Sequence, residues 1–224
     1  MTKRKQSTRS LFRSFLFSGT VALSPGIALP AAASTITNGG FETGDFTGWV
    51  TSPSPPGSVL IVTAASFGPP VNNRVHDGTY AVTFGAVDTG GGVLSQTFST
   101  IPGTTYNLSF WYGTTAYNSY PQSLTTEVLP SAGAVPLLNQ TTQFNTNGDP
   151  TSQWMFLTFQ FVADGSQATI RFADISGITA WADGMIDTVS IDPTPLPAAL
   201  PLFATGLGAL GLLGWRRKRK AKAA

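Results

Sequence analysis

The sequence predicts an all-β protein whose central part folds as a jelly-roll β-sandwich. Between Ser34 and Asp192 the chain is rich in Gly, Thr, Ser, Phe and Val, a composition that favours strands over helices. Short segments with alternating apolar residues recur through this region, and clusters of Gly, Pro, Asn and Asp separate them. We find no convincing amphipathic helical pattern there. The region has about 160 residues, which is the length of one domain.

Eight segments carry the strand pattern. The clearest are Tyr106–Tyr112 and Trp154–Val162, in which every second residue belongs to one apolar row. Trp111 and Trp154 fall on the opposite, less apolar rows of these two strands. The other candidates are Val59–Ala64, Tyr80–Phe84, Val93–Phe98, Leu124–Leu129, Ala168–Phe172 and Met185–Ile191. Eight or nine strands at this spacing favour two packed sheets.

The first 33 residues have the pattern of a secretory signal peptide. Basic residues from Lys3 to Arg13 overlap an apolar stretch from Leu11 to Leu29, and Ala31–Ala33 supplies small residues before Ser34. We therefore expect residues 1–33 to be a signal peptide and residues 34–192 to form a domain outside the cytoplasm. The alternatives are an uncleaved anchor and a disordered tail.

The last segment, residues 193–224, combines an apolar run with a basic end. The run from Leu196 to Trp215 has no charge, and Arg216–Lys220 follows it directly. Twenty residues in a helix rise about 30 Å, the thickness of a hydrocarbon core. We expect a single transmembrane helix at about 197–215, with the basic end at 216–222 on the cytoplasmic side. A buried C-terminal helix of a globular domain is the alternative.

This tail resembles the PEP-CTERM sorting signal that exosortases recognise. The resemblance is carried by Pro195-Leu196-Pro197, the Leu/Gly-rich run and the basic pair Arg216 and Arg217, with Leu196 where the usual motif has Glu. It implies export, transient anchoring in the membrane and an exosortase-like enzyme as partner. The final location would be the cell surface or an extracellular polysaccharide matrix such as a biofilm.

Removing both ends reverses the charge of the chain. Of the 13 Lys and Arg residues, only Arg74 and Arg171 lie between Ser34 and Trp215. All 11 acidic residues lie between Glu42 and Asp192, so the domain has a net charge of about −9. An acidic exported domain argues against nucleic acid as a partner, because nucleic acid requires a positive face. The chain has no Cys, which excludes disulfide bonds and thiol chemistry.

The domain opens with Asn38-Gly39-Gly40-Phe41-Glu42, followed by Phe46 and Trp49 as expected anchors of an irregular segment. This run resembles the start of galactose-binding-like jelly rolls, a group that includes many carbohydrate-binding modules. The His76–Val82 segment resembles the turn into their third strand. Asp187-Thr188-Val189 resembles their last strand, with Thr188 in place of the usual Asn. The resemblance implies a structural calcium ion shared by Glu42 and Asp187.

The residues themselves also favour a metal. Asp187 has the parity of Val189 and Ile191, so we expect it at the end of a core-facing row, where a carboxylate needs a partner. Two cations cannot neutralise 11 acids. The hypothesis is a structural Ca²⁺ held by Glu42, Asp187 and backbone carbonyls, with Asp77 or Asp183 as additional ligands. In the alternative, Asp187 caps a turn and Glu42 is solvated.

Five aromatic residues could form a platform for sugar rings, namely Trp111, Tyr117, Tyr120, Trp154 and Trp181. The three tryptophans are the predicted ligand-binding residues. No nucleophile elbow or zinc-binding helix motif occurs, and His76 is the only His. We therefore predict a non-catalytic surface or matrix protein that is associated with polysaccharide. Two alternatives remain, namely a self-associating coat protein without a small ligand and, less favoured, a secreted glycan-active enzyme that uses paired carboxylates.

Overall fold

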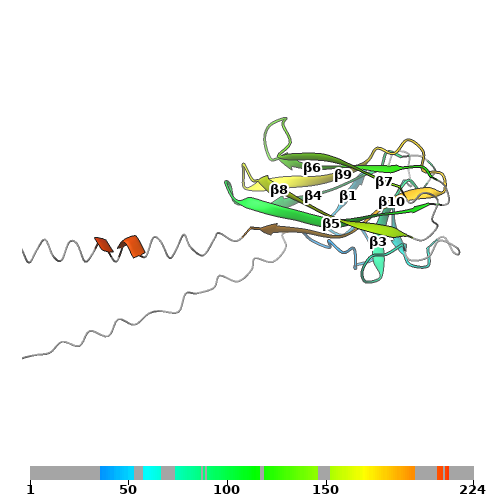
Figure 1. The fold of residues 1–224 in the computed structure, drawn as a ribbon, viewed down its shortest axis with the longest axis horizontal. Coiled ribbons are helices and arrows are strands. Elements are labelled where there is room, and N and C mark those ends of the chain that lie inside the picture. The colour runs from blue at the N-terminus through cyan, green and yellow to red at the C-terminus, as the bar shows by residue number, and fades with distance from the viewer. Residues whose placement is uncertain are drawn as a thin grey trace, which may run out of the picture. The chain divides into compact units, whose positions relative to one another are not determined.

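The computed structural model describes residues 36–52, 58–66, 74–86, 88, 90–116, 119–145, 152–194, 206–208 and 210–211. The domain within these ranges is all-β, as the sequence predicts (Figure 1). Its strands are β1 (Val50–Ser52), β2 (Val59–Thr63), β3 (Tyr80–Phe84), β4 (Val93–Ser99), β5 (Thr105–Ala116), β6 (Gln122–Pro130), β7 (Leu138–Phe144), β8 (Gln153–Val162), β9 (Gln167–Asp174) and β10 (Ala182–Pro193).

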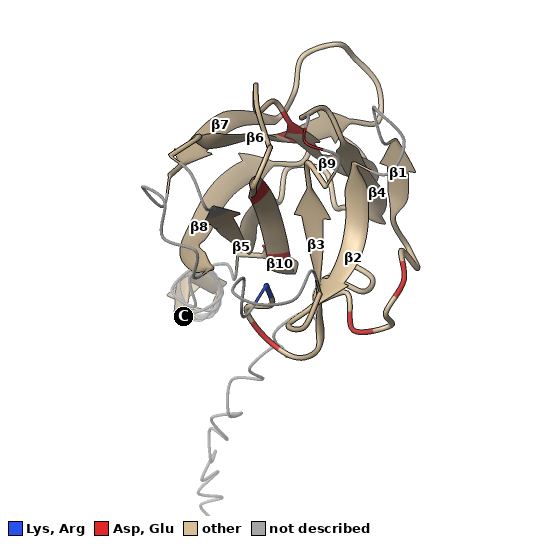
Figure 2. Cartoon of the chain, turned by 90° about the vertical axis from the view of Figure 1, so that its right-hand side faces the viewer, with Lys and Arg blue, Asp and Glu red and all other residues tan. Residues whose placement is uncertain are grey.

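The strands form two five-stranded sheets that pack face to face. One sheet has the order β1-β4-β9-β6-β7 and the other has the order β2-β3-β10-β5-β8. All pairings between neighbouring strands are antiparallel. Figure 2 shows the two layers from one end of the sandwich. We call these layers the first sheet and the second sheet, and the predicted two-sheet sandwich is confirmed.

The core lies between the sheets and is built from alternate residues of each strand. Leu108, Phe110 and Tyr112 of β5 are fully buried. The rings of Phe110 and Phe172 meet edge to face across the two sheets, with centroids 4.9 Å apart. Burying a large apolar side chain contributes about 1.5–3 kcal/mol. The apolar residues on the inner faces of the two sheets are therefore the main source of stability.

All eight predicted strands are present, and β1 and β7 were not foreseen. Strand β7 reads Leu-Asn-Gln-Thr-Thr-Gln-Phe and pairs only with β6, so it is an edge strand. Most of its side chains are exposed or half-buried. It therefore shows no row of apolar residues, which is the signal that predicts a strand.

Both ends of the chain fall largely outside the described residues. This holds for the signal peptide expected at 1–33 and for Pro195, Leu196, Pro197, Arg216 and Arg217 of the sorting motif. Within the helix expected at 197–215, residues 206–208 and 210–211 are helical. Over the described ranges, no helix is long and apolar enough to cross a membrane. Strand β10 continues to Pro193, one residue past the expected end of the domain.

Candidate functional site

Residues 36–49, which we call the N-terminal clip, fasten the start of the domain to the sandwich. Phe41 is fully buried and Trp49 nearly so, with ring centroids 5.4 Å apart. The indole N–H of Trp49 donates to the carbonyl of Asn38 at 3.0 Å. Phe46 is partly buried against the same core. The predicted role of these three aromatic residues as anchors is confirmed.

Backbone contacts join the clip to both sheets. The Val189 amide of β10 donates to the Gly39 carbonyl at 2.8 Å. On the other sheet, the Gln96 side chain accepts from the Thr37 amide at 2.7 Å and donates to the Thr37 carbonyl at 2.9 Å. Gly39 allows this approach, because a Cβ there would lie 2.0 Å from the Val189 carbonyl oxygen. The clip therefore closes one side of the sandwich.

Strand β10 contains a bulge that changes the direction of Asp187. The register pairs Asp187 with Trp111 and Ser190 with Ser109, so three steps on β10 match two on β5. Thr188 has a φ of 53°, in the left-handed region. The expectation that Asp187 shares a core-facing row with Ile191 is therefore wrong. Asp187 lies with Trp111 on the outer face of the second sheet.

Asp187 is nonetheless fully buried, because a loop covers it. Its Oδ2 accepts hydrogen bonds from the His76 amide at 3.0 Å and the Asp77 amide at 3.1 Å. Its Oδ1 accepts from the Thr188 amide at 2.6 Å. Burial raises the pKa of the Asp187 carboxyl, and these backbone hydrogen bonds oppose the rise. We call residues 76–80 the latch loop.

Glu42 of the clip holds the other half of the latch loop. Both of its carboxylate oxygens accept from the Thr79 amide at 3.0 Å, and Oε1 also accepts from the Tyr80 amide at 3.1 Å. Gly78, with a φ of 68°, lies against the Glu42 carboxylate, where a Cβ would be 2.4 Å from Oε1. Glu42 and Asp187, which come from opposite ends of the domain sequence, thus both bind the latch loop by accepting hydrogen bonds from its backbone amides.

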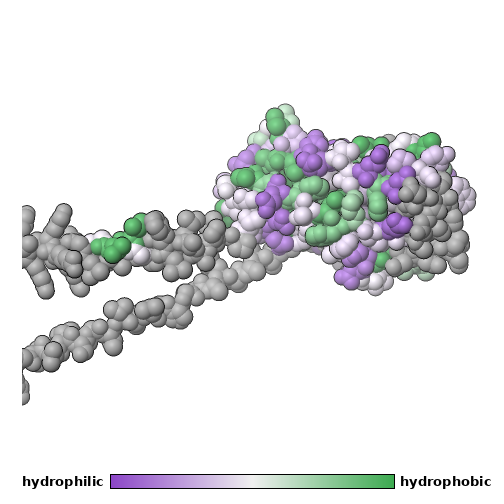
Figure 3. All heavy atoms as spheres, viewed as in Figure 1, coloured by the Kyte–Doolittle hydropathy of each residue, from purple (hydrophilic) through white to green (hydrophobic). Residues whose placement is uncertain are grey.

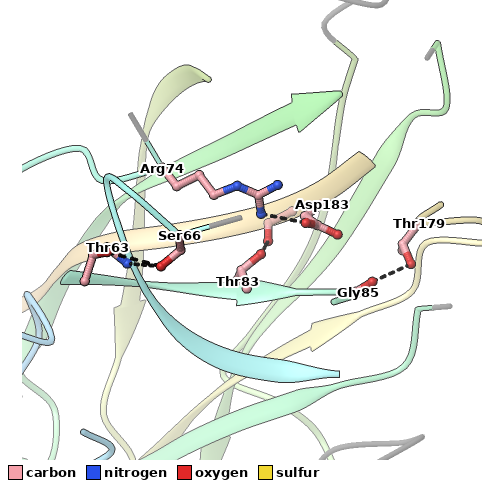
Figure 4. A network of polar contacts seen from close by, with 8 residues as sticks. Thr63, Ser66, Arg74, Thr83, Gly85, Thr179 and Asp183 are labelled. Carbon is pink, nitrogen blue, oxygen red and sulfur yellow. Dashed lines mark hydrogen bonds and ion pairs between the residues drawn. The ribbon is translucent and has the colours of Figure 1, made fainter. Parts of the chain in front are cut away.

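Asp183 lies elsewhere, in a buried ion pair with Arg74 (Figure 4). The Nη1 of Arg74 donates to Oδ2 of Asp183 at 2.7 Å. Burial raises the pKa of the Asp183 carboxyl, and the neighbouring guanidinium opposes the rise. Asp183 precedes Asp187 by four strand residues, roughly 13 Å along β10.

The four predicted calcium ligands therefore do not converge. Glu42 and Asp187 grip the latch loop, Asp77 lies in that loop and accepts from the Gly78 amide, and Asp183 pairs with an arginine. Across the described parts of the chain, no group of three or more His, Asp or Glu residues is close enough to hold a metal ion. As they lie, these four acids do not fit one Ca²⁺ site, and calcium binding stays a prediction of the resemblance.

Trp111 and Trp154 lie near each other on the outer face of the second sheet, as their strand parity predicts. Trp154 covers Gly113, where a Cβ would stand 2.6 Å from the indole ring. The imidazole of His76 stacks on Trp111 with centroids 3.9 Å apart and meets Trp154 edge-on at 5.6 Å. Both indoles are half-buried, so they serve as packing partners of the latch loop. The sequence contained no signal for the stacked position of His76.

Trp181 is separate from this pair and lies just before β10. Its side chain is 75% exposed. Its φ is 60°, a left-handed conformation that is a genuine outlier for a bulky residue and costs about 1–3 kcal/mol. Of the three tryptophans predicted to contact sugar, Trp181 is the one displayed to solvent.

Residues 119–121 and 175–181 form one end of the sandwich, which we call the tip. Four apolar or aromatic side chains of these two loops are exposed to solvent, namely Tyr120 (43% exposed), Ile175 (54%), Ile178 (49%) and Trp181. The Gln122 side chain donates to the carbonyls of both Tyr120 and Ile178, at 3.3 and 3.2 Å, and so joins the two loops. Tyr120 is one of the aromatic residues that the sequence suggests for sugar contact, whereas Ile178 was not singled out, because an isolated apolar residue in a loop carries no periodic signal. Tyr117 lies outside the described residues.

The outer face of the first sheet is polar instead of aromatic. Arg171 pairs with Glu127, and the Asn139 side chain donates to Glu127 at 3.3 Å, which makes a polar row across β9, β6 and β7. Thr97 and Thr169 share a hydrogen bond at 2.8 Å on the same face. Figure 3 shows hydrophobic and hydrophilic residues interspersed on one face of the domain.

Comparison with known proteins gives a family for this architecture. A family model described as a carbohydrate binding domain matches residues 33–178. Among solved structures, TmCBM61 in complex with β-1,4-galactotriose is 22% identical with a TM-score of 0.51, and covers 73% of this chain and 100% of its own. A family 16 carbohydrate-binding module is 20% identical (TM-score 0.45, 70% and 98% covered). The CBM22-1 xylan-binding domain from Paenibacillus barcinonensis Xyn10C is 17% identical (0.47, 75% and 100%). No curated protein sequence matches.

Proposed function

The chain belongs to the family of carbohydrate-binding domains that matches residues 33–178, and we propose that it is a non-catalytic polysaccharide-binding protein of the cell surface or extracellular matrix. The family match is the observation that carries this proposal. It spans the clip and the strands from β1 to β9, and it ends before Trp181 and β10. The fold that the domain shares with TmCBM61 is consistent with it.

The chemistry of the domain surface is consistent with a neutral or weakly charged glycan. The two arginines of the domain are each paired with an acid. The remaining acids leave the domain with an excess of negative charge, which disfavours anionic polymers such as nucleic acid. Exposed aromatic and hydroxyl-bearing side chains are the groups that pack on sugar rings and hydrogen-bond their hydroxyls.

Sequence features at the two ends support the proposed route to the surface. The signal-peptide pattern at 1–33 and the tail at 193–224 lead us to propose export, transient membrane anchoring and processing by an exosortase-like enzyme. The test is to express the full chain and a chain truncated after Thr194, fractionate the cells and sequence the mature C-terminus. We expect the full chain in the envelope or processed near Pro195, and the truncated chain in the medium. Equal distribution of both would contradict the proposed sorting.

Binding is tested directly by sedimentation with insoluble polysaccharide. The purified full-length chain is mixed with β-1,4-galactan, with xylan and with extracellular polysaccharide from the cells that produce it. We expect the chain to sediment with at least one of them and to be released by a soluble form of the same glycan. If it stays in solution with all three, the proposed function is wrong, and concentration-dependent self-association would then favour the coat-protein alternative.

A further inference from the structure

We propose that the tip of the sandwich is the glycan-contact surface, with the Trp181 indole stacked on one sugar ring and Tyr120 and Ile178 beside it. This inference rests on the proposed polysaccharide-binding function and assigns it a place. The occupant is a pyranose residue of a neutral polysaccharide, because such a ring offers an apolar C–H face to an aromatic ring and hydroxyls at its edge.

The first argument is the availability of the aromatic face. Trp181 is 75% exposed, whereas one face of Trp111 is covered by the His76 imidazole and Trp154 lies over Gly113. A sugar ring could stack on Trp111 from the His76 side only by displacing the latch loop, whose amides are held by Glu42 and Asp187. At Trp181, by contrast, three quarters of the side chain is already open to solvent.

The second argument is the backbone conformation at Trp181. A φ of 60° suits glycine and is unfavourable for a bulky residue. Backbone conformations of this kind cluster at ligand-binding and active sites, which is consistent with a functional role for Trp181.

The third argument is that the tip is held in shape before any ligand arrives. The Gln122 side chain joins the loops through the Tyr120 and Ile178 carbonyls. The loop of residues 175–181 is also held by Thr179, whose hydroxyl donates to the Gly85 carbonyl at 2.8 Å (Figure 4). A preformed surface lowers the entropy cost of binding a flexible polymer.

Polar groups border the apolar side chains of the tip. The Thr179 amide donates to the carbonyl of Asp88 at 3.4 Å, which places the exposed Asp88 beside the loop that carries Trp181. The Tyr120 side chain is 43% exposed and carries a hydroxyl group. Carboxylate and hydroxyl groups at the margin of an aromatic face match the hydroxyls at the edge of a sugar ring.

The direction of β10 places Trp181 and the start of the C-terminal tail at opposite ends of the domain. Trp181 directly precedes β10, and Thr194 directly follows it, so the two residues lie at opposite ends of a twelve-residue strand. The chain leaves the domain towards its C-terminal tail at Thr194, next to the Thr105 end of β5. A ligand surface at Trp181 is therefore at the end of the sandwich far from the point where the tail begins.

The test compares substitutions of Trp181 in the full-length chain, with the polysaccharide that retains the wild-type protein as probe. Trp181→Ala should weaken binding at least tenfold, and Trp181→Phe, which keeps a ring, should weaken it less than Trp181→Ala. Trp181→Gly should lose binding while its melting temperature equals or exceeds that of the wild type, because glycine relieves the strained φ. The control is Ile101→Ala, which changes another exposed apolar residue (65%) near the opposite end of the sandwich and should bind as the wild type does.

The outcomes separate this inference from the function on which it rests. If the wild-type chain binds none of the three polysaccharides, both are wrong. If the wild type binds and Trp181→Ala binds equally well, the protein is a glycan binder whose contact surface is not the tip. Equal weakening by Trp181→Ala and Ile101→Ala would also overturn the assignment, since it would indicate a general loss of exposed apolar surface.

Discussion

Glu42 is an exposed carboxylate whose oxygens nevertheless accept three backbone hydrogen bonds from Thr79 and Tyr80. Hydrogen bonds to a charged acceptor are stronger than neutral ones, and their loss leaves amide groups of the latch loop without an acceptor. The motif around Phe41 singled out this residue. Its partners lie 37 and 38 residues away and were not foreseen.

We expect Glu42→Gln to destabilise the domain by about 1–2 kcal/mol, because an amide group replaces one accepting oxygen. Thermal unfolding followed by circular dichroism, in buffer with excess chelator, measures this effect. Asp164→Asn is the matched control, since Asp164 is exposed and outside the latch. A cost that appears only when calcium is added would show that Glu42 acts through a cation, contrary to the direct role described above.

At the scale of elements, the clip shows how one irregular segment completes the sandwich. The Gly39 carbonyl accepts from the Val189 amide of β10, at the bulge that turns Asp187 outward. The clip and the bulge are therefore coupled. A side chain at position 39 would disturb both, because its Cβ would overlap the Val189 carbonyl oxygen.

Two neighbouring glycines allow a matched comparison. A Cβ at Gly39 would lie 2.0 Å from backbone, whereas a Cβ at Gly40 would lie 3.7 Å from its nearest neighbour, the Glu42 side chain. We expect Gly39→Ala to lower the free energy of unfolding by about 1–3 kcal/mol and Gly40→Ala to change it little. Urea unfolding monitored by tryptophan fluorescence measures both. Equal effects of the two substitutions would mean that the clip does not dock tightly on β10.

The elements also show where prediction from the sequence succeeds and where it fails. Strands with one face turned to the core, such as β5 and the half-buried β8, were predicted because such a face demands alternation of apolar and polar residues. The polar edge strand β7 lacks that demand. The bulge at Thr188 makes the alternation of residues an unreliable guide to the face of Asp187. One extra residue in the strand moves the residues before it to the opposite face from the one that the alternation predicts. The exposure of Trp181 depends on loop packing, which no local pattern encodes.

At the scale of the whole domain, the charge is unevenly compensated. The two arginines pair with Asp183 and Glu127, and the other acids have no arginine partner in the ion pairs of the described residues. Asp174 is buried, and burial raises the pKa of its carboxyl although Ser176 donates to it. The Oδ2 of Asp174 is buried without a hydrogen-bond partner in the described structure. Burying this charge opposes folding at neutral pH.

The pH dependence of stability follows from that raised pKa. The folded-state pKa of Asp174 lies above the ordinary value of 3.8, so the folded domain binds the proton more tightly than the unfolded chain does. This contribution to stability is fully present below pH 3.8 and is lost as the pH rises through the folded-state pKa. Asp183 and Asp187 are shifted in the same direction by burial. We therefore expect a higher melting temperature at pH 5 than at pH 7.5.

Asp174→Asn tests the assignment of this effect, because the amide oxygen can keep the hydrogen bond from the Ser176 amide while the charge is removed. Melting temperatures measured from pH 4.5 to 8 should depend less on pH in this variant than in the wild type, and its stability at neutral pH should rise. Asp164→Asn should keep the wild-type slope, since that carboxylate is exposed. A wild-type domain that loses stability steadily on mild acidification would contradict the argument. It would mean that its carboxylates gain more from their charge in the folded state than burial costs them.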